Sequence, residues 1–254
     1  MFMKFKNKVY IITGATSGMG RSIALEFAKE GASLMLSGRN KERGEKVRTL
    51  SSQKNTSHFF SGDLSLELVN KSLVEECMTT FGRLDGVITN AGMLGLGNIT
   101  DLPSEDWHKT FQINVHSVYY LLKYSIPEML KNENGVVVIN SSIAAFKSFP
   151  NHPAYCASKA AAVALAKQAA LDYGPKIRVN AICPGPVDTP FLHDSAIAFP
   201  DPKSAVEEAG NSTLMKRLGQ PEDIAKLAVF LASDDASWIT GCSYTIDGGI
   251  LTAG

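Results

Sequence analysis

Short apolar runs alternate with longer segments of helical spacing along all 254 residues of the chain. Strands that are apolar on both faces and separated by helices form a parallel sheet with helices on each side. The predicted strands are residues 8–13, 33–37, 57–61, 84–89, 136–140, 177–182 and 243–246. The predicted helices are residues 18–30, 41–52, 65–80, 104–130, 153–173 and 221–232. The pattern therefore predicts an α/β fold, a doubly wound, Rossmann-like parallel sheet of seven strands with helices on both faces.

An eight-stranded β/α barrel is the competing architecture, because barrels also have about 250 residues. Seven predicted strands, and a Gly-rich turn after the first of them, favour the open sheet. No linker, repeat or low-complexity tract interrupts the chain, so residues 1–254 are expected to form a single domain. Residues 190–216 carry three prolines and little regular pattern, which predicts a binding loop or lid.

Start and stop signals flank several predicted helices. Ser65 is the expected cap of the third helix, and Ser104 of the fourth. Gly31 is expected to end the first helix and Gly174-Pro175 the fifth.

Composition excludes several classes of protein. The chain has 25 basic and 25 acidic side chains, so neither nucleic acid nor an anionic membrane is an expected partner. The apolar run after the basic N-terminus is too short for a signal peptide, and no run is long enough to span a membrane, so a cytoplasmic protein is expected. The four cysteines and five histidines show no metal-ligand spacing, so neither disulfides nor a metal is expected.

A Gly-rich turn, Thr13–Gly20, lies between the first predicted strand and the first predicted helix. Glycines at 14, 18 and 20 let the backbone turn tightly and approach a ligand closely. The helix that follows points free N–H groups at the same place, which favours a bound diphosphate. The turn therefore predicts a dinucleotide site.

The end of the second predicted strand indicates which dinucleotide. An acidic residue at this point holds a ribose 2′-hydroxyl, whereas an arginine suits a 2′-phosphate. Gly38 stands where the acid is expected, and Arg39 follows it. A guanidinium binds phosphate in a bidentate manner, so NADP(H) is favoured and NAD(H) is the less favoured alternative.

Three further strand ends carry turn residues suited to the same ligand, since ligands of open α/β sheets bind at the carboxyl ends of the strands. Asp63-Leu64 and Asn90-Ala91-Gly92 are expected to flank the adenine and its ribose. The rigid segment Pro184–Thr189 suits the nicotinamide ring.

Candidate catalytic residues follow the fifth predicted strand. Ser142 lies just beyond the end of that strand, and Tyr155 and Lys159 lie four residues apart on one face of the next helix. Ser142 is placed to hydrogen-bond the reacting oxygen beside the phenol. Tyr119 and Lys123 repeat the spacing, but no strand end with a hydroxyl residue precedes them, so they are not expected to act.

A tyrosine acid/base must have its pKa lowered. A free phenol has a pKa near 10, so catalysis at neutral pH calls for a fall of about three units. An ammonium about 4 Å away supplies a shift of roughly that size, and Lys159 is the expected source.

Taken together, these motifs resemble the short-chain dehydrogenase/reductase family, in its single-domain branch of roughly 250 residues. The resemblance covers nearly the whole chain and includes the segments Arg217–Asp223 and Asp247–Gly249. It implies that Tyr155 exchanges a proton with the substrate oxygen, that Lys159 assists it and binds the nicotinamide ribose, and that Asn114 holds a water in a proton relay. It also implies a homotetramer formed through the helices at 104–130 and 153–173 and the last strand.

The implied cofactor contacts include Val187 and Thr189 at the carboxamide and Ser37 beside Arg39. The complete predicted cofactor set is Gly14, Ser17, Gly18, Met19, Gly20, Ser37, Arg39, Asp63, Leu64, Asn90, Ala91, Gly92, Tyr155, Lys159, Pro184, Gly185, Val187 and Thr189.

The expected function is hydride transfer between NADP(H) and a secondary alcohol or its ketone. One alternative is a 3-oxoacyl-carrier-protein reductase, although residues 131–134 before the fifth strand are not strongly basic. The other is a nucleotide-binding regulator without catalysis. The substrate stays open, because residues 190–216 suit either an apolar molecule such as a steroid or a polar polyol.

Overall fold

The computed structural model describes residues 3–52, 56–132 and 134–253; Glu133, part of the segment weighed for a carrier protein, lies outside them. Within these residues seven parallel strands form one sheet in the order β3-β2-β1-β4-β5-β6-β7, which confirms the predicted open sheet. The strands are β1 Val9–Thr13, β2 Ser33–Gly38, β3 Ser57–Ser61, β4 Gly86–Thr89, β5 Gly135–Asn140, β6 Ile177–Pro184 and β7 Ser243–Ile246.

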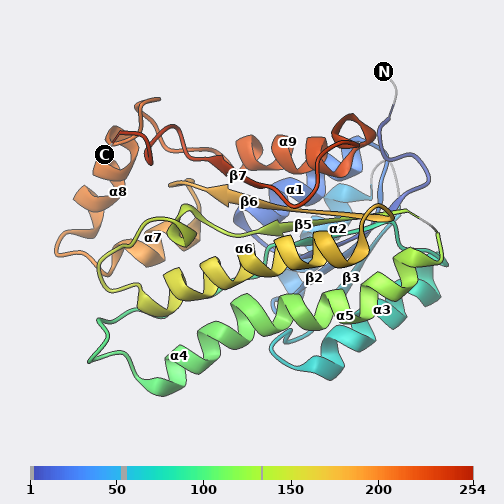
Figure 1. Ribbon diagram of the computed structural model, residues 1–254, viewed down its shortest axis with the longest axis horizontal. Helices are drawn as coiled ribbons and strands as arrows, with labels where there is room; N and C mark the ends of the chain where they lie inside the picture. Colours follow the sequence, from blue (N-terminus) through green and yellow to red (C-terminus); the bar gives the residue numbers. More distant parts are fainter. Residues whose placement is uncertain (1–2, 53–55, 133, 254) are drawn as a thin grey trace.

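Helices cover both faces of the sheet. The helices are α1 Gly18–Lys29, α2 Lys41–Ser51, α3 Glu67–Phe81, α4 Ser104–Phe111, α5 Ser117–Leu130, α6 Pro153–Tyr173, α7 Pro190–Ala196, α8 Pro202–Asn211 and α9 Pro221–Ala232. Figure 1 shows α1, α2 and α9 on one face, α3, α5 and α6 on the other, and α7 and α8 together at one end of the sheet.

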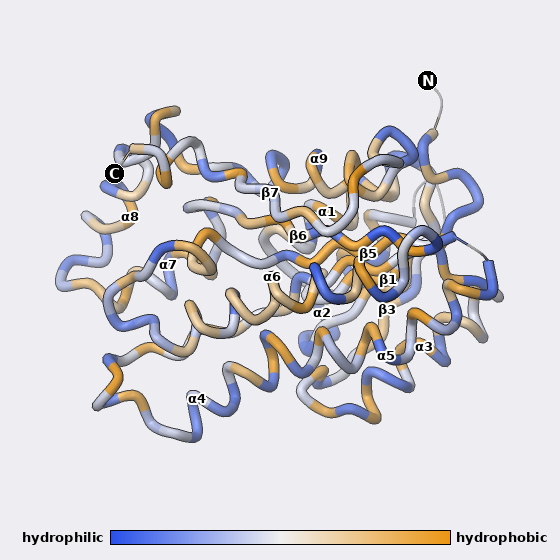
Figure 2. The backbone as a smooth tube through the Cα atoms, viewed as in Figure 1, coloured by the Kyte–Doolittle hydropathy of each residue, from blue (hydrophilic) through white to orange (hydrophobic). Residues whose placement is uncertain are grey.

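Strand β1 shows why both faces are covered. Val9 and Ile11 pack into a core cluster with α3, α5 and α6. Tyr10 and Ile12 point to the opposite face and pack with α1 and α9. Successive side chains of a strand alternate between faces, so an uninterrupted apolar strand needs a helical layer on each side. Figure 2 shows the hydrophobic strands in the middle of the molecule.

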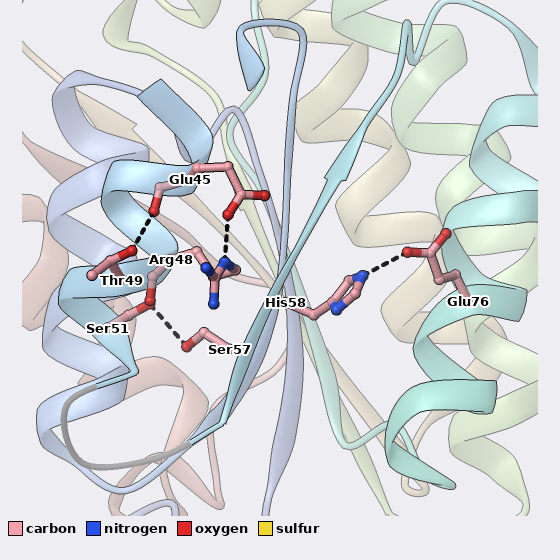
Figure 3. A network of polar contacts seen from close by, with 7 residues as sticks. All are labelled: Glu45, Arg48, Thr49, Ser51, Ser57, His58 and Glu76. Carbon is pink, nitrogen blue, oxygen red and sulfur yellow. Dashed lines mark hydrogen bonds and ion pairs between the residues drawn. The ribbon is translucent and has the colours of Figure 1, made fainter. Parts of the chain in front are cut away.

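The edge strand β3 is held by polar contacts on both faces (Figure 3). On one face, Ser51 Oγ at the end of α2 donates to Ser57 Oγ at 2.8 Å. On the other, His58 Nε2 lies 2.8 Å from Glu76 Oε1 of α3. These contacts fix β3 beside β2, with Ser61 paired to Gly38 where both strands end.

Several predicted boundaries are wrong. The predicted helix 104–130 is divided by a π-helical segment, Gln112–His116. Ser65 does not cap α3; its backbone N–H donates to Asp63 Oδ1, and this turn delays the helix to Glu67, with Leu66 at the cap. Ser104 is the first residue of α4 rather than its cap.

The predicted irregular segment 190–216 contains two helices, α7 and α8. Pro190 and Pro202 each stand at a helix start, where the missing proline N–H has no intrahelical partner to lose. The side chains of Thr189 and Asp201 cap these helices by accepting backbone N–H groups. The prolines therefore begin helices here instead of breaking them.

Candidate active site

A cleft of about 250 Å³ lies at the carboxyl ends of the strands. It spans the junction of β1 and β4, where successive strands diverge to opposite halves of the sheet, the usual ligand position in such folds. The predicted site residues that line it are Gly14, Ser17, Gly18, Met19, Arg39, Asp63, Leu64, Asn90, Ala91, Gly92, Tyr155, Lys159 and Thr189.

The Gly-rich turn makes room for a ligand that approaches the backbone. Gly14 has φ +62°, and a Cβ there would lie 2.9 Å from the backbone nitrogen of Ala91. A Cβ at Gly20 would overlap the Gly14 carbonyl oxygen, so Gly20 acts by packing beneath the turn and does not line the cleft. These residues fit a dinucleotide diphosphate, since only glycine allows the turn and the helix start to pack this closely.

At the end of β2, Ser37 and Arg39 lie in different environments. Ser37 is fully buried, its Oγ has no partner within the described residues, and it does not line the cleft. Arg39 lines the cleft and is exposed. Gly38 has no room for an acid, because a Cβ at this position would lie 2.5 Å from Thr16 Cγ2.

Hydrogen bonds connect the turn after β4 to its neighbours. Thr13 Oγ1 accepts the backbone N–H groups of Asn90 and Ala91, at 3.0 and 3.2 Å. Asn140 Nδ2 donates to Asn90 Oδ1 at 2.7 Å. Lys159 Nζ donates to the Asn140 carbonyl at 3.0 Å. Asn140 was missed as a site residue, and its place at the end of a strand was the available signal.

The pKa of Tyr155 differs from the sequence expectation. Burial raises the pKa of Tyr155 to about 12, and a hydrogen bond with Ser142 opposes part of this rise. Burial lowers the pKa of Lys159 to about 8. Lys159 Nζ lies 5.6 Å from the centroid of the Tyr155 ring. The expected fall in the Tyr155 pKa is therefore wrong for the chain alone, because desolvation outweighs the hydrogen bond with Ser142.

Asn114 lies in the π-helical segment, and its side chain forms hydrogen bonds with two neighbouring segments. Its Oδ1 accepts the Met93 N–H at 2.8 Å, and its Nδ2 donates to the Met93 carbonyl and to Ser158 Oγ, both at 2.9 Å. A Cβ at Gly92 would lie 3.6 Å from Asn114 Oδ1 and 3.7 Å from Lys159 Nζ. Asn114 therefore braces the turn after β4 against α6, behind the small space beside Gly92.

A second cavity, of about 160 Å³, adjoins the cleft. Ser142 lines it, together with the predicted residues Pro184, Gly185 and Val187 of the turn after β6. The two cavities share Met19, Ser141, Tyr155, Thr189 and Phe191. Tyr155 therefore lies where the cleft and the second cavity meet.

Helices α7 and α8 form the outer wall of this second cavity, through side chains such as Phe191, Leu192 and Val206. His152 also lines it and is buried, with only 3% of its surface exposed. His152 was not among the predicted site residues. Its position one helical turn before Tyr155 was the signal that could have identified it.

The second Tyr/Lys pair lies elsewhere. Tyr119 is 49% exposed, and Lys123 Nζ forms an ion pair with Glu67 Oε1 at 2.6 Å. Neither residue lines the cleft or the second cavity.

Among the helices of the described residues, none is both long and apolar enough to cross a membrane.

Comparisons with known proteins agree with this geometry. A family model described as Enoyl-(Acyl carrier protein) reductase matches residues 14–251. A cyclohexanol dehydrogenase from Acinetobacter sp. (strain SE19) is 37% identical over 261 residues, which cover 98% of this chain and 96% of that protein.

Two solved structures have the same fold. An NAD⁺-bound xylitol dehydrogenase is 33% identical, with a TM-score of 0.92 over 97% of this chain and 100% of that chain. An L-sorbose reductase from Gluconobacter frateurii, complexed with NADPH and L-sorbose, is 30% identical, with a TM-score of 0.92 over 99% of each chain. The chain belongs to the short-chain dehydrogenase/reductase family, and it is an oxidoreductase that acts on alcohols or ketones with a nicotinamide dinucleotide.

Proposed function

We propose that this protein transfers a hydride between NADP(H) and a secondary alcohol or its ketone, with Tyr155 as the acid/base. We also propose that residues 1–254 form a single dinucleotide-binding and catalytic domain. The position of Tyr155 carries the proposal, because its side chain belongs both to the cleft that fits a dinucleotide and to the second cavity. A substrate in that cavity would lie between Ser142 and Tyr155, with the cofactor cleft beside it.

A bound dinucleotide would supply or accept the hydride. The Gly-rich turn would hold the diphosphate, Asp63 and the Asn90 turn would hold the adenosine half, and Pro184–Thr189 would hold the nicotinamide. Of the remaining predicted contacts, Gly20 would act through packing and Ser37 through the β2 backbone, since its carbonyl accepts the Ala15 N–H at 3.0 Å.

The preference for NADP(H) over NAD(H) rests on two residues at the end of β2. Arg39 is exposed at the cleft, and within the described residues its guanidinium has no hydrogen-bond or ion-pair partner. The lack of space at Gly38 excludes the carboxylate that would hold a 2′-hydroxyl and repel a phosphate. One solved relative is bound to NAD⁺ and another to NADPH, so the family alone does not decide between them.

The proton chemistry follows from the environments of three side chains. The raised pKa of Tyr155 keeps its phenol protonated at neutral pH, ready to donate to a carbonyl oxygen in reduction. Ser142 would hold the same oxygen. Lys159 would bind the nicotinamide ribose, and its lowered pKa suits it to pass a proton onward. The space beside Gly92, between Lys159 and Asn114, is where we place the relay water.

Replacing Tyr155 with Phe tests the mechanism. We expect kcat to fall by about 100- to 10,000-fold, the usual size of an acid/base contribution, while the dissociation constant for NADPH stays within about threefold. Turnover is followed by NADPH absorbance and binding by fluorescence titration. Tyr119→Phe is the matched control, since Tyr119 repeats the spacing to a lysine but lies on the exposed side of α5. Equal turnover in both variants would exclude Tyr155 as the acid/base, whereas NADPH binding without turnover in the wild type would favour the non-catalytic regulator.

A carrier-protein reductase remains the second candidate, because the matching family model is described as Enoyl-(Acyl carrier protein) reductase. Such an enzyme must dock a strongly acidic protein and needs a basic patch. Lys131, near the β5 end of α5, is paired with Glu128 at 2.6 Å, which reduces its availability. Reduction of a 3-oxoacyl thioester on carrier protein at least ten times faster than on a small thiol carrier would favour this candidate.

We further propose a homotetramer in the cytoplasm. Exposed apolar residues on the expected contact elements support the assembly: Tyr119 of α5 is 49% exposed, Leu171 of α6 is 78% exposed, and Trp238 before β7 is 98% exposed. Sedimentation of the purified protein measures its oligomeric state directly.

A further inference from the structure

The second cavity has the walls of a site for an uncharged ligand. Among the described residues that line it, none is Asp, Glu, Lys or Arg, and most are aliphatic or aromatic, including Ile143, Phe149, Phe199 and Ile250. Burial lowers the pKa of His152, so its imidazole is also neutral at pH 7. A carboxylate or phosphate in this cavity would lose its water without gaining a counter-ion, and would bind poorly.

The size of the cavity limits the ligand further. Its volume is about 160 Å³. An engineered apolar cavity of about 150 Å³ in another protein binds benzene, so this space suits a single six-membered ring. A fused four-ring skeleton is larger than this volume and would extend out of the open side of the cavity.

Apart from Ser142 and the polar residues shared with the cleft, which are Ser141, Tyr155 and Thr189, the wall of the second cavity carries one polar pair among the described residues. His152 Nδ1 lies 2.5 Å from the Pro150 carbonyl oxygen, and His152 Nε2 lies 2.8 Å from Ser195 Oγ. A carbonyl only accepts, so Nδ1 carries the proton and Nε2 of the neutral ring is an acceptor. Ser195 therefore donates its hydroxyl proton to Nε2, and its remaining lone pairs can only accept from a ligand.

This pair joins the start of α6 to α7. His152 directly precedes α6, while Ser195 belongs to α7. Both residues line the cavity, and the His152 ring centroid lies 6.2 Å from that of Tyr155. A substrate ring whose reacting oxygen is held by Tyr155 and Ser142 would therefore have the His152–Ser195 pair beside another of its carbons. At that carbon the pair offers a hydrogen-bond acceptor and no donor.

We infer that the substrate is an uncharged, single-ring secondary alcohol or ketone that carries a second hydroxyl group, which donates to the His152–Ser195 pair. The inference rests on the proposed function, because it places the reacting carbon at Tyr155. A sugar or open-chain polyol has more hydroxyl groups than this wall can satisfy, and each unpaired buried hydroxyl weakens binding. A second carbonyl would lack a donor at this position.

Three ketones with the same ring test the inference: cyclohexanone, 4-hydroxycyclohexanone and cyclohexane-1,4-dione. With the purified full-length protein and NADPH, we expect kcat/KM for the hydroxyketone to exceed that for each of the other two by about tenfold, since a site built to pair with a hydroxyl rejects analogues that lack it. The 3-hydroxy isomer covers the alternative position on the ring. The charged analogue 4-oxocyclohexanecarboxylate should be at least 100-fold poorer than cyclohexanone.

Ser195→Ala should reduce the preference, because the ligand hydroxyl loses the Ser195 oxygen and keeps only the His152 Nε2 acceptor, so the hydroxyketone-to-cyclohexanone ratio of kcat/KM should fall toward one. Ser212→Ala is the matched control, because Ser212 is an exposed serine just after α8 and does not line the cavity; its ratio should equal that of the wild type. Retained NADPH binding shows that each variant is folded.

The outcomes separate this inference from the proposed function. Preference for the carboxylate, for a ketohexose or for the dione would overturn the inference while leaving the proposed reaction intact. An unchanged ratio in Ser195→Ala would also overturn it. Absence of turnover with every ketone and alcohol, in the presence of normal NADPH binding, would instead contradict the proposed function and the inference with it.

Discussion

At the scale of single residues, the site depends on where burial and free space place each group. Arg39 and Ser37 are two residues apart, yet only Arg39 reaches the cleft, because Ser37 is buried within β2 whereas Arg39 lies just beyond the end of that strand. Lys159 and Tyr155 are both shifted toward their uncharged forms by burial. The exposure of Arg39 and the lowered pKa of Lys159 each lead to a prediction.

Arg39→Ala should weaken NADPH binding by about 10- to 100-fold, the loss expected for one charged hydrogen-bonding pair. NADH binding should change by less than about threefold, since NADH lacks the 2′-phosphate. Fluorescence titration of both cofactors measures the two constants. Lys46→Ala, which removes another exposed cation of α2, is the control. Equal affinity of the wild type for NADH and NADPH would contradict the assignment.

Lys159→Met should change how stability depends on pH. The folded chain releases the Lys159 proton near pH 8, whereas the unfolded chain keeps it to about pH 10.5. Between these values the unfolded chain binds more protons, so the stability of the wild type rises with pH by up to about 3 kcal/mol, and the variant lacks this rise. Urea unfolding at pH 7 and pH 10 measures it. A stability difference between the two proteins that is the same at both pH values would contradict the lowered pKa.

At the scale of the elements, the sequence analysis misread some local helix signals and missed one segment that distant contacts shape. Thr189-Pro190 and Asp201-Pro202 each form the capping residue and first residue of a helix, although the prolines were interpreted as signs of a loop. The π-helical segment within the predicted helix 104–130 places Asn114 against Met93 and Ser158. Such segments often occur at functional sites, and nothing in the local helical pattern marks this one.

Gly44→Ala should destabilise the protein by about 1–3 kcal/mol, the usual cost of overpacking. Helix propensity alone predicts the opposite, a gain of roughly 0.5–1 kcal/mol from replacing a glycine inside α2. The tertiary contact decides, because a Cβ at Gly44 would overlap the ring of Phe59 on β3. Chemical denaturation measures the difference. In a Phe59→Leu background the cost should shrink, and a stabilised single variant would contradict the contact.

At the scale of the whole molecule, the site exists only because the sheet brings separate strand ends together. The cleft takes residues from the ends of β1, β2, β3, β4 and β5, from α6 and from the start of α7. Two core clusters, one on each face of the sheet, hold these ends in register. An unfolded chain has no such cleft, so a cofactor that binds here stabilises only the folded state.

NADPH at about 100 times its dissociation constant should raise the free energy of unfolding by about 2.7 kcal/mol. For a chain of this size that corresponds to an increase in Tm of roughly 5–10 °C. Thermal denaturation with and without NADPH measures the shift. NADH at the same concentration should give a smaller shift, and no shift with either cofactor would mean that the cleft does not bind a dinucleotide.

The sequence by itself determined the seven-stranded parallel sheet, and it predicted most of the residues that line the cleft. The reason is that alternating apolar runs, glycine turns and residues at strand ends are local features, and parallel strands bring all their carboxyl ends to one edge. The roles of Asn114 and of the residues implied only by the family resemblance could not be derived from spacing.

Only the tertiary structure decided the rest. It brought His152 and Ser195 together from segments 43 residues apart, buried Ser37, and formed one wall of the second cavity from α7 and α8. It also raised the pKa of Tyr155, where charge spacing predicted a fall. Desolvation, cavity shape and long-range hydrogen bonds depend on which distant atoms surround a group, and the order of residues along a strand or helix does not specify those neighbours.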